Sequence, residues 1–405
     1  MPKILQINSA INYGSTGKIA EQIGLLAMQD GWDSYIAHGR YINSSESKSI
    51  QVGNRLAWGY HALMTRITDQ HGRFSTYTTK NLIKQIREIK PDIIHLHNIH
   101  GYYLNYKVLF KYLCEANIPV VWTLHDCWPM TGHCTHFESV KCDRWQSGCY
   151  NCPLKNAYPS SLILDRSKKN YIEKKKCFSS IKNLTLVPVS NWIAGVVRKS
   201  FLKDANLIVN HNGIDVQVFH PCHDSKLVEQ YNLNGKRVIL GVASPWSDKK
   251  GLPDFSSLCE YLPNDAYQIV LIGLTSEQIK SLPKGIIGLC RTNSVTELAQ
   301  WYSLADVFVN LTYEDTYPTT NLEAISCGTP VITYRTGGSP ESVTPQTGRV
   351  VEQGNLEGVV KAIEELCAED REAMRKRCRE YALEHFDRNK NYKKYIELYE
   401  QLLKH

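Results

Sequence analysis

The sequence lacks three features that would each point to a particular class of protein. No stretch of its 405 residues stays apolar over the length needed to span a bilayer. Met1 to Asn8 lacks the charged start and long apolar core of a secretory leader. No Asp-x-Asp triplet occurs, which argues against a divalent ion holding a diphosphate through that motif. We therefore expect a cytoplasmic protein without a catalytic metal.

Charge and repetition are also weak signals. The chain carries 47 Lys+Arg against 40 Asp+Glu, a formal net charge of +7, and shows no clear basic stripe. Nucleic acid is therefore not an expected partner. No internal repeat or low-complexity tract is evident. A chain of this length exceeds one hydrophobic core and suits two domains of about 200 residues each.

The first half of the chain alternates short apolar strands with helices of 3.6-residue period. The expected strands are 3–8, 34–37, 92–97, 118–125, 184–189 and 207–209, with helices near 17–28, 79–89 and 106–116. Parallel strands joined by helices bind ligands outside their carboxyl ends. That edge should carry four polar residues, namely Asn8, His97, Asn98 and His125.

A second alternating series follows. Its expected elements are the strands 237–243, 268–273, 306–310 and 331–332 and a helix at 296–304. Gly, Pro and polar residues interrupt the apolar pattern at 211–221, which marks a domain boundary. We expect an α/β fold with two Rossmann-like domains, 1–212 and 213–388. A last helix in 389–405 could pack back on the first domain.

The most informative stretch runs from Asp315 to Glu323. Pro318 fits the first position of a helix, so the unpaired amides of the first turn, beside Thr319 and Thr320, would suit a diphosphate. From the second turn, the Glu323 carboxylate could accept hydrogen bonds from the paired hydroxyls of a ribose, and Asp315 could reach hydroxyls of a transferred sugar. The alternative is a solvated helix residue and a loop charge.

With the Gly328-Thr-Pro330 run that follows, this stretch resembles the signature of retaining glycosyltransferases of the GT-B architecture, two Rossmann-like domains facing each other across a cleft. That family has two glutamates separated by seven residues. Asp315 stands where the first usually lies, with Glu314 beside it. The segment Asn212-Gly-Ile-Asp215 also matches the family's interdomain pattern. The resemblance implies glycosyl transfer from a nucleoside diphosphate sugar to a hydroxyl, with the anomeric configuration retained.

The resemblance also implies roles for single residues. His125, at a strand end, corresponds to a histidine that contacts the donor sugar; the alternative is a histidine satisfied in a buried strand end. Lys250, before Gly251, corresponds to a lysine that holds the leaving phosphates; the alternative is a solvated lysine. Pro245 stands where the family has an arginine, so the second cation must come from elsewhere. The candidates for it are Lys249, Arg291 and Arg335.

The glycine-rich turn Gly14-Ser-Thr-Gly17-Lys18 is not a nucleotide triphosphate loop, because Asn12 and Ile19 stand where that motif needs Gly and Ser or Thr. It matches the family's first glycine-rich loop, although a tight turn without a ligand remains an alternative.

The candidate residues fall into three groups. The catalytic candidates are His125, Lys250, Asp315 and Glu323. The donor-binding candidates are Gly14, Gly17, Asn212, Gly213, Lys249, Arg291, Thr319, Thr320 and Asn321. The acceptor-binding candidates are His97 and Asn98.

Cysteine is unevenly distributed. The chain has 13 cysteines, and five lie between Cys127 and Cys152. Four of them, Cys134, Cys142, Cys149 and Cys152, end in a Cys-x-x-Cys pair and could hold a structural zinc as four thiolates. Reduced thiols or a redox pair are the alternatives.

The insert formed by residues 127–153 is similar to that of bacterial exopolysaccharide transferases of the colanic-acid type. This likeness implies a glycan or polyprenyl-linked oligosaccharide acceptor, in biosynthesis of a capsule, exopolysaccharide or O-antigen. The enzyme would then work at the cytoplasmic face of the inner membrane. Segments 171–178 and 196–203 mix basic and apolar residues and could touch lipid, although ordinary surface helices share that pattern.

Three other functions stay open. A sugar-nucleotide epimerase would share the fold without needing an acceptor. A phosphorylase normally carries a pyridoxal lysine, for which the sequence shows no clear signal. A noncatalytic scaffold would use the cysteine-rich insert to bind a partner.

Overall fold

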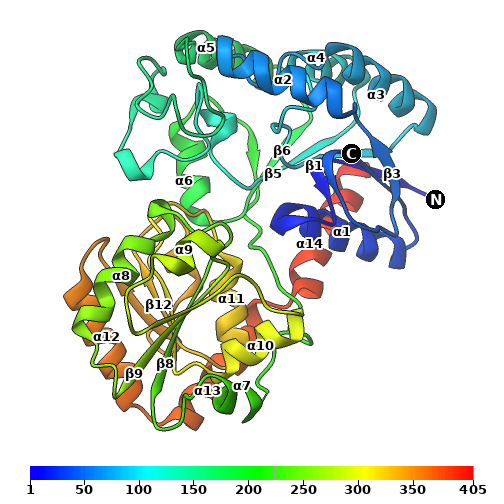
Figure 1. Cartoon of the computed structure of the whole chain (residues 1–405). Coiled ribbons are helices and arrows are strands. Elements are labelled where there is room, and N and C mark those ends of the chain that lie inside the picture. The colour runs from blue at the N-terminus through cyan, green and yellow to red at the C-terminus, as the bar shows by residue number, and fades with distance from the viewer. Residues whose placement is uncertain (223–224, 405) are drawn as a thin grey trace. The chain divides into compact units, whose positions relative to one another are not determined.

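The computed structural model describes residues 1–222 and 225–404 (Figure 1). They form two compact units. Unit 1 contains residues 1–211 and the C-terminal residues from Tyr392 on, and unit 2 contains Asn212–Asn391. The boundaries predicted from the sequence, after residues 212 and 388, lie within three residues of these.

Unit 1 is built on a seven-stranded parallel sheet in the order β3-β2-β1-β4-β5-β6-β7. Its strands are β1 (Lys3–Ile11), β2 (Asp33–Ile42), β3 (Lys48–Gln51), β4 (Ile93–Leu96), β5 (Val120–Leu124), β6 (Leu184–Pro188) and β7 (Asn206–Leu207). Its helices are α1 (Gly14–Gln29), α2 (Arg55–Thr68), α3 (Thr76–Ile89), α4 (Tyr106–Ala116), α5 (Ser167–Phe178) and α6 (Asn191–Lys199). Three short 3-10 turns, Trp128–Met130, Glu138–Val140 and Arg144–Gln146, lie in the cysteine-rich insert.

Unit 2 is built on a six-stranded parallel sheet in the order β10-β9-β8-β11-β12-β13. Its strands are β8 (Arg237–Val242), β9 (Tyr267–Ile272), β10 (Ile286–Leu289), β11 (Val307–Asn310), β12 (Val331–Tyr334) and β13 (Gly348–Val351). Its helices are α7 (Ser225–Gln230), α8 (Leu252–Tyr261), α9 (Ser276–Lys280), α10 (Val295–Leu304), α11 (Thr319–Ser326), α12 (Leu356–Ala368) and α13 (Arg371–His385). Two 3-10 turns, Asp248–Lys250 and Ser339–Ser342, follow β8 and β12, and α14 (Arg388–Leu403) ends the chain's helices.

Each sheet reverses its strand order once. In unit 1 the chain runs outward from β1 to β3 and then returns to place β4 on the other side of β1, and in unit 2 the same reversal separates β8 from β11. A reversal of this kind opens a crevice at the carboxyl ends of the two strands, where ligands bind in open α/β sheets. The predicted α/β class with two Rossmann-like domains is confirmed.

The buried central strands explain why the sequence pattern was informative. Every residue of β4 and β5 is buried, which matches their almost continuous runs of apolar side chains. The helix predicted at 106–116 is observed with those limits, and Asn105 caps it by accepting hydrogen bonds from the amides of Lys107 and Val108.

Some predicted limits are wrong. Helix α1 begins at Gly14, whose φ of 63° starts the turn, rather than at Gly17. Pro318 is the residue before α11 and not its first residue. Its φ of −69° would fit a helix, but its ψ of 118° is extended. Strands β3 and β13 and helix α2 were not predicted, because each is short or mixes polar and apolar residues without a clear period.

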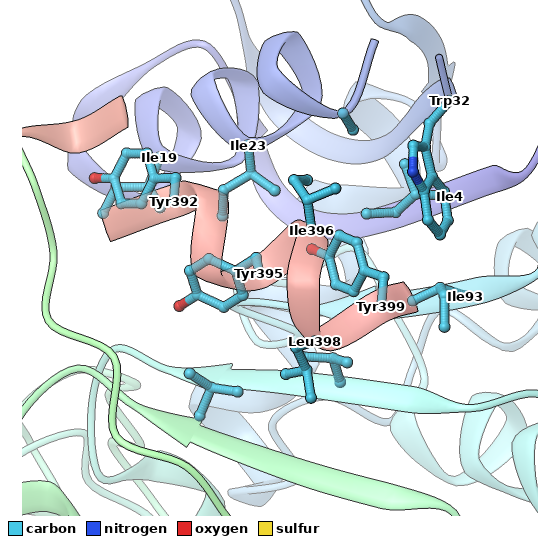
Figure 2. Close-up of a cluster of buried hydrophobic side chains, with 13 residues drawn as sticks. Ile4, Ile19, Ile23, Trp32, Ile93, Tyr392, Tyr395, Ile396, Leu398 and Tyr399 are labelled. Carbon is cyan, nitrogen blue, oxygen red and sulfur yellow. The ribbon is translucent and has the colours of Figure 1, made fainter. Parts of the chain in front are cut away.

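The C-terminal helix α14 supplies part of the core of unit 1. Figure 2 shows Tyr392, Tyr395, Ile396 and Tyr399 pointing into a buried cluster that also contains residues of α1 and of the sheet. The Trp32 and Tyr399 rings meet edge to face at 5.6 Å, and the Tyr399 hydroxyl is 2.7 Å from Nδ1 of His95. The last helix therefore closes a surface of the first sheet.

The variant Tyr399→Ala should destabilise unit 1 by about 3–5 kcal/mol, the usual effect of truncating a buried aromatic side chain. Denaturant unfolding followed by tryptophan fluorescence would measure the loss. Glu400→Ala, an exposed change at the next position of the same helix, is the matched control. Equal stability of the two variants would contradict a packing role for α14.

Candidate active site

The loop after β8 places two lysines at the strand-order reversal of unit 2. Lys249 donates to the Glu314 carboxylate at 2.7 Å, and Lys250 donates to the Asp315 carboxylate at 2.8 Å. Gly251 must be glycine, because its φ is 77° and a Cβ would lie 2.2 Å from the Leu311 carbonyl oxygen. The loop after β8 is thus packed closely against the loop after β11, and the predicted Lys250 and Asp315 are in direct contact.

Helix α11 follows this loop. Thr319 and Thr320 form its first turn and are half-buried. Asn321 is fully buried instead, accepting from the Asn310 side chain at 2.8 Å and donating to the Ser342 hydroxyl at 3.0 Å. These bonds give the Asn321 side chain a structural role at the base of the site.

Glu323 lies one turn further along α11. Its carboxylate accepts a 2.9 Å hydrogen bond from the hydroxyl of Tyr302, a fully buried residue of α10. Burial and the neighbouring Glu323 charge raise the pKa of Tyr302 well above its ordinary value, so the phenol keeps its proton and orients the carboxylate. Tyr302 was not predicted, because nothing in the local pattern of α10 links it to a residue 21 positions later.

The other two predicted cations, Arg291 and Arg335, do not share the ion pairs of the two lysines. Arg291 is exposed in the loop after β10. Arg335, after β12, is paired with Glu352 at 2.6 Å on the surface. Among the three candidates for the second phosphate-binding cation, Lys249 is the one next to Lys250 in the chain and at the strand-order reversal.

The interdomain residues Asn212 and Gly213 are held by the chain near α14. A Cβ on Gly213 would lie 2.4 Å from the Cα of Arg388, and Asn391 donates to the Asn212 carbonyl oxygen at 3.5 Å. Arg388 is also paired with Asp215 at 2.7 Å. The close approach of the Arg388 backbone therefore explains why residue 213 is a glycine.

In unit 1, the glycine-rich turn joins β1 to α1 at the corresponding reversal. A Cβ on Gly14 would meet nothing within 4 Å, so its φ of 63° is the reason for glycine there. Gly17 is buried, and a Cβ there would lie 3.3 Å from the backbone nitrogen of Asn12 and 3.4 Å from the carbonyl oxygen of Ala10. Nearby, the backbone amide of Asn98 donates to Oδ1 of Asn8 at 3.2 Å, and this hydrogen bond joins the segment after β4 to β1.

His97 and His125 follow β4 and β5 and touch each other. Nδ1 of His97 is 3.0 Å from Nε2 of His125, and Nε2 of His97 is 3.0 Å from Oε1 of Gln6. His97 is 1% exposed, so it lies behind His125. Burial lowers the pKa of His125 to about 4 and that of His97 well below its usual range, so both rings are neutral at pH 7.

A pair formed by a histidine and an aspartate lies beside them. Nε2 of His100 is 2.7 Å from the Asp126 carboxylate, and both side chains are buried. Burial alone would raise the pKa of Asp126, but the charge and hydrogen bond of His100 lower it. The rings of His71, Trp128 and Tyr158 contact that of His100, and Tyr102 packs in turn against Tyr158. Neither His100 nor Asp126 was predicted as a site residue.

The four predicted zinc ligands converge on one small cavity of about 20 Å³, lined also by His133 and Trp145. A hydrogen bond donated to Cys152, burial and nearby cysteines raise the pKa of Cys134, and the same bond lowers the pKa of Cys152 to about 7. Cys149 accepts from the Gly132 amide at 3.1 Å. As the side chains stand, the described residues contain no group of three or more His, Cys, Asp or Glu placed to hold a metal ion.

Membrane-spanning helices are also absent from the described residues: none of their helices combines the necessary length with the necessary apolar character.

Two Rossmann-like units, with lysines and carboxylates gathered where the second sheet reverses, form an architecture that many nucleotide-binding α/β enzymes share. Sequence comparison is more specific. Residues 56–218 match the model of Glycosyltransferase Family 4, and residues 224–385 match that of Glycosyl transferases group 1. The chain belongs to this family of GT-B glycosyltransferases.

Individual relatives agree with this assignment. The putative colanic acid biosynthesis glycosyl transferase WcaC of Escherichia coli (strain K12) is 24% identical over 387 residues, covering 86% of this chain and 87% of that protein. Among solved structures, sucrose-phosphate synthase from Thermosynechococcus elongatus aligns with a TM-score of 0.73 at 18% identity, over 99% of both chains. Anabaena Alr3699/HepE in complex with UDP-glucose aligns with a TM-score of 0.66 at 14% identity, over 98% of this chain and 99% of that one.

Proposed function

We propose that the protein transfers a sugar from a nucleoside diphosphate sugar to a hydroxyl of a glycan or lipid-linked oligosaccharide, with retention of configuration and without a catalytic metal. The pathway would be synthesis of a surface polysaccharide such as a capsule, exopolysaccharide or O-antigen. The contact of Lys250 with Asp315 at the strand-order reversal of unit 2 is the observation that carries the proposal. The names of the E. coli WcaC and of the HepE–UDP-glucose complex support the polysaccharide pathway and the donor class.

The donor would bind at the carboxyl edge of unit 2. Lys249 and Lys250 would exchange their carboxylate partners for the diphosphate, which the first-turn amides of α11 also favour. Glu323, oriented by Tyr302, would accept hydrogen bonds from the ribose hydroxyls. Asp315 would be released from Lys250 and could then meet a hydroxyl of the transferred sugar.

Bond cleavage would move negative charge onto the phosphate oxygen as the sugar becomes oxocarbenium-like. Lys250 and the amides of α11 would stabilise that charge, and loss of one such donor typically costs about a hundredfold in rate. The departing phosphate would take the proton of the acceptor hydroxyl, so no side chain is assigned as the base. Of the two acceptor candidates, Asn98 lies at the carboxyl edge of unit 1, while His97 is buried there.

A structural zinc in the cysteine-rich insert is part of the proposal. Four thiolates around one cavity have the donor chemistry of a closed zinc site, which would leave no open position for a substrate. Binding would require Cys134 and Cys152 to give up their mutual hydrogen bond and lose their protons. The metal would brace the insert between β5 and α5 and take no part in the transfer.

We also propose peripheral contact with an anionic membrane, but not through segments 171–178 and 196–203. In α5, Tyr171 and Phe178 are buried and Ile172 is exposed, and α6 buries Val196 and Val197, so neither segment presents a continuous apolar stripe to lipid. Helix α2 differs, because it exposes an apolar stripe of Leu56, Tyr60, Leu63 and Ile67 opposite its buried Trp58, His61 and Thr65.

The loop 162–164 extends this stripe. Leu162, Ile163 and Leu164 are all exposed, and the Leu162 amide donates to the Arg66 carbonyl oxygen at 2.8 Å, which places the loop at the end of α2. We call these seven residues of α2 and the loop the apolar face. Helix α2, which runs along the surface of unit 1 (Figure 1), has two arginines and no acidic residue.

Charge favours lipid as the occupant of the apolar face. Lys155 lies beside it, with its ammonium 3.4 Å from the Ile163 carbonyl oxygen. An acidic residue, Asp165, follows the loop, and its carboxylate accepts hydrogen bonds from the backbone amides of Cys152 and Ser167. Exposed apolar side chains with arginine and lysine at their margin fit an anionic headgroup layer.

The variant Glu323→Gln should abolish stabilisation by the true donor. A donor at a hundredfold excess over its Kd stabilises the wild type by about 2.7 kcal/mol, which a thermal-shift panel of sugar nucleotides would detect. Glu364→Gln, on the exposed side of α12, is the control and should respond as the wild type does. Unchanged donor stabilisation and transfer in Glu323→Gln would refute the assignment. An epimerised donor without any acceptor product would favour the epimerase.

Protein purified without chelators or a metal-binding tag should contain roughly one zinc per chain. Cys149→Ala should lose the metal and melt at a lower temperature, while Cys114→Ala, an exposed cysteine outside the insert, should keep both. Elemental analysis and a thiol titration check this. Metal-free, folded wild-type protein with all 13 thiols reactive after unfolding would support reduced cysteines instead.

The double variant Leu56→Ser/Leu63→Ser should bind vesicles of phosphatidylglycerol and phosphatidylcholine at least tenfold more weakly than the wild type, because burying one leucine contributes about 1.5–3 kcal/mol. Leu383→Ser, an exposed leucine of unit 2, is the control. Cosedimentation should also weaken with salt. Equal binding to neutral vesicles, or a concentration-dependent dimer abolished by the double variant, would overturn the lipid assignment.

A further inference from the structure

Three half-exposed tyrosines lie at the carboxyl edge of unit 1. Tyr13 follows β1 and directly precedes α1, Tyr41 lies near the end of β2, and Tyr158 follows the cysteine-rich insert. Their exposed fractions are 49%, 47% and 43%. Single tyrosines on a surface are common and need no explanation, but these three belong to one series of ring contacts.

The series is continuous. The rings of Tyr13 and Tyr41 are stacked, with their centres 5.0 Å apart and 13° between their planes. The Arg40 guanidinium lies 5.3 Å from the centre of the Tyr41 ring and 5.5 Å from that of Tyr102. The Tyr102 ring in turn lies 5.9 Å from that of Tyr158. We call these five residues the aromatic row. Ligands of open α/β sheets bind at this edge.

Hydrogen bonds hold the exposed end of the aromatic row in place. The Asn12 side chain donates to the Ser44 carbonyl oxygen at 2.6 Å, and the Asn43 side chain donates to the Asn12 carbonyl oxygen at 2.8 Å. The Asn43 amide also donates to the Ile11 carbonyl oxygen at 3.1 Å. These bonds join the two segments that carry the stacked tyrosines. The rings are therefore preorganised, and a ligand that binds them orders little of the chain.

Arg40 is the charged member of the aromatic row. It is exposed, and its side chain forms no hydrogen bond or ion pair with any residue among 1–222 and 225–404. The guanidinium instead lies over the rings of Tyr41 and Tyr102, which orient it by cation–π contact. A guanidinium held in this way keeps its N–H groups for the planar, paired oxygens of a phosphate or carboxylate.

Stacked aromatic rings beside a positive charge suit an acidic sugar chain. A pyranose has a face of C–H bonds, whose weakly positive hydrogens pack against the negative face of an aromatic ring. Three half-exposed rings offer such contacts to more than one sugar. Lipid is a poorer match, because acyl chains favour aliphatic side chains like those of the apolar face, and the exposed members of the aromatic row are tyrosines and an arginine.

We propose that the aromatic row binds an anionic oligosaccharide, with its sugars stacked on Tyr13, Tyr41 and Tyr158 and a phosphate or carboxylate of the same glycan bound to Arg40. The row lies wholly in unit 1. The role of this glycan as the acceptor rests on the proposed function, whereas its binding does not. Two sources have the required anion, namely the phosphate of a lipid-linked carrier and the carboxylate of an acidic sugar.

A glycan array with neutral, uronate-bearing and phosphate-bearing oligosaccharides tests the proposal on the full chain without any donor. The wild type should bind anionic members more tightly than their neutral counterparts, and this preference should shrink at high salt. A preference for phosphate would favour the lipid-linked carrier as the source, and a preference for uronate would favour an acidic sugar. No binding, or equal binding of neutral and anionic members, would overturn the proposal.

Variants locate the binding. Tyr13→Ala/Tyr41→Ala should weaken it roughly tenfold, because each lost aromatic contact costs about threefold or more, while Tyr13→Phe/Tyr41→Phe keeps both rings and should bind as the wild type does. Arg40→Gln should weaken binding of anionic members by about fivefold and leave neutral members unchanged. Arg87→Gln is the control, since that arginine also lies over a tyrosine ring, in α3. Wild-type binding by a folded Tyr13→Ala/Tyr41→Ala protein, judged by circular dichroism, would exclude the row.

Two further measurements separate this inference from the other proposals. Stabilisation by the sugar-nucleotide donor and binding to anionic vesicles should both be unchanged in Tyr13→Ala/Tyr41→Ala. Loss of either would assign the two rings to the donor or to the membrane and overturn the glycan assignment. An oligosaccharide that binds the row but never receives a sugar would contradict the proposed function and leave the row as a glycan-binding site.

Discussion

Two ion pairs join the loop after β8 to the loop after β11: Lys249 with Glu314 and Lys250 with Asp315. Their positions depend on the single reversal of strand order in unit 2, which brings the ends of two strands distant in sequence to one edge. The pairs hold two ammonium groups at that edge while keeping it close to neutral. The proposed diphosphate would therefore compete with carboxylates already in place, and each phosphate contact that it made would free an acid.

Helix α11 and the buried Tyr302 complete this arrangement in unit 2. The first turn of α11 presents Thr319 and Thr320, while Asn321 is turned inward and fastens the helix to Asn310 and Ser342. The buried Tyr302 hydroxyl orients the Glu323 carboxylate by donating a hydrogen bond to it. Unit 1 is organised differently, because its edge is lined by buried, neutral histidines and not by ion pairs.

Most of the fold could be predicted from the sequence, because buried parallel strands are apolar almost throughout and their helices keep a regular period. The strands around Ile93–Leu96 and Val307–Asn310 were found for that reason. The edge strand β3 and the half-exposed α2 lack such a signal. Pro318 was placed one position too far into its helix, since its φ suits both the helix and the residue before it and only ψ distinguishes them.

The candidate site was predictable where a motif spans consecutive residues, as from Asp315 to Glu323. Partners that come from other elements carried no signal. Three such partners are each distant in sequence from the residue that they contact. They are Gln6 with His97, Tyr302 with Glu323, and Asp69, whose carboxylate is 2.5 Å from Nδ1 of His133. Burial could not be read either: His97 and Asn321 look like ligand-facing residues in a linear motif and are enclosed in the structure.

The placement of α14 affects how the chain is made. The first sheet packs against Tyr392, Tyr395 and Tyr399, which are synthesised after the whole of unit 2 (Figure 2). While unit 2 is being made, the N-terminal sheet therefore has an uncovered apolar surface. Folding of unit 1 is completed only once α14 has been synthesised, so chaperones can bind that surface while unit 2 is being translated.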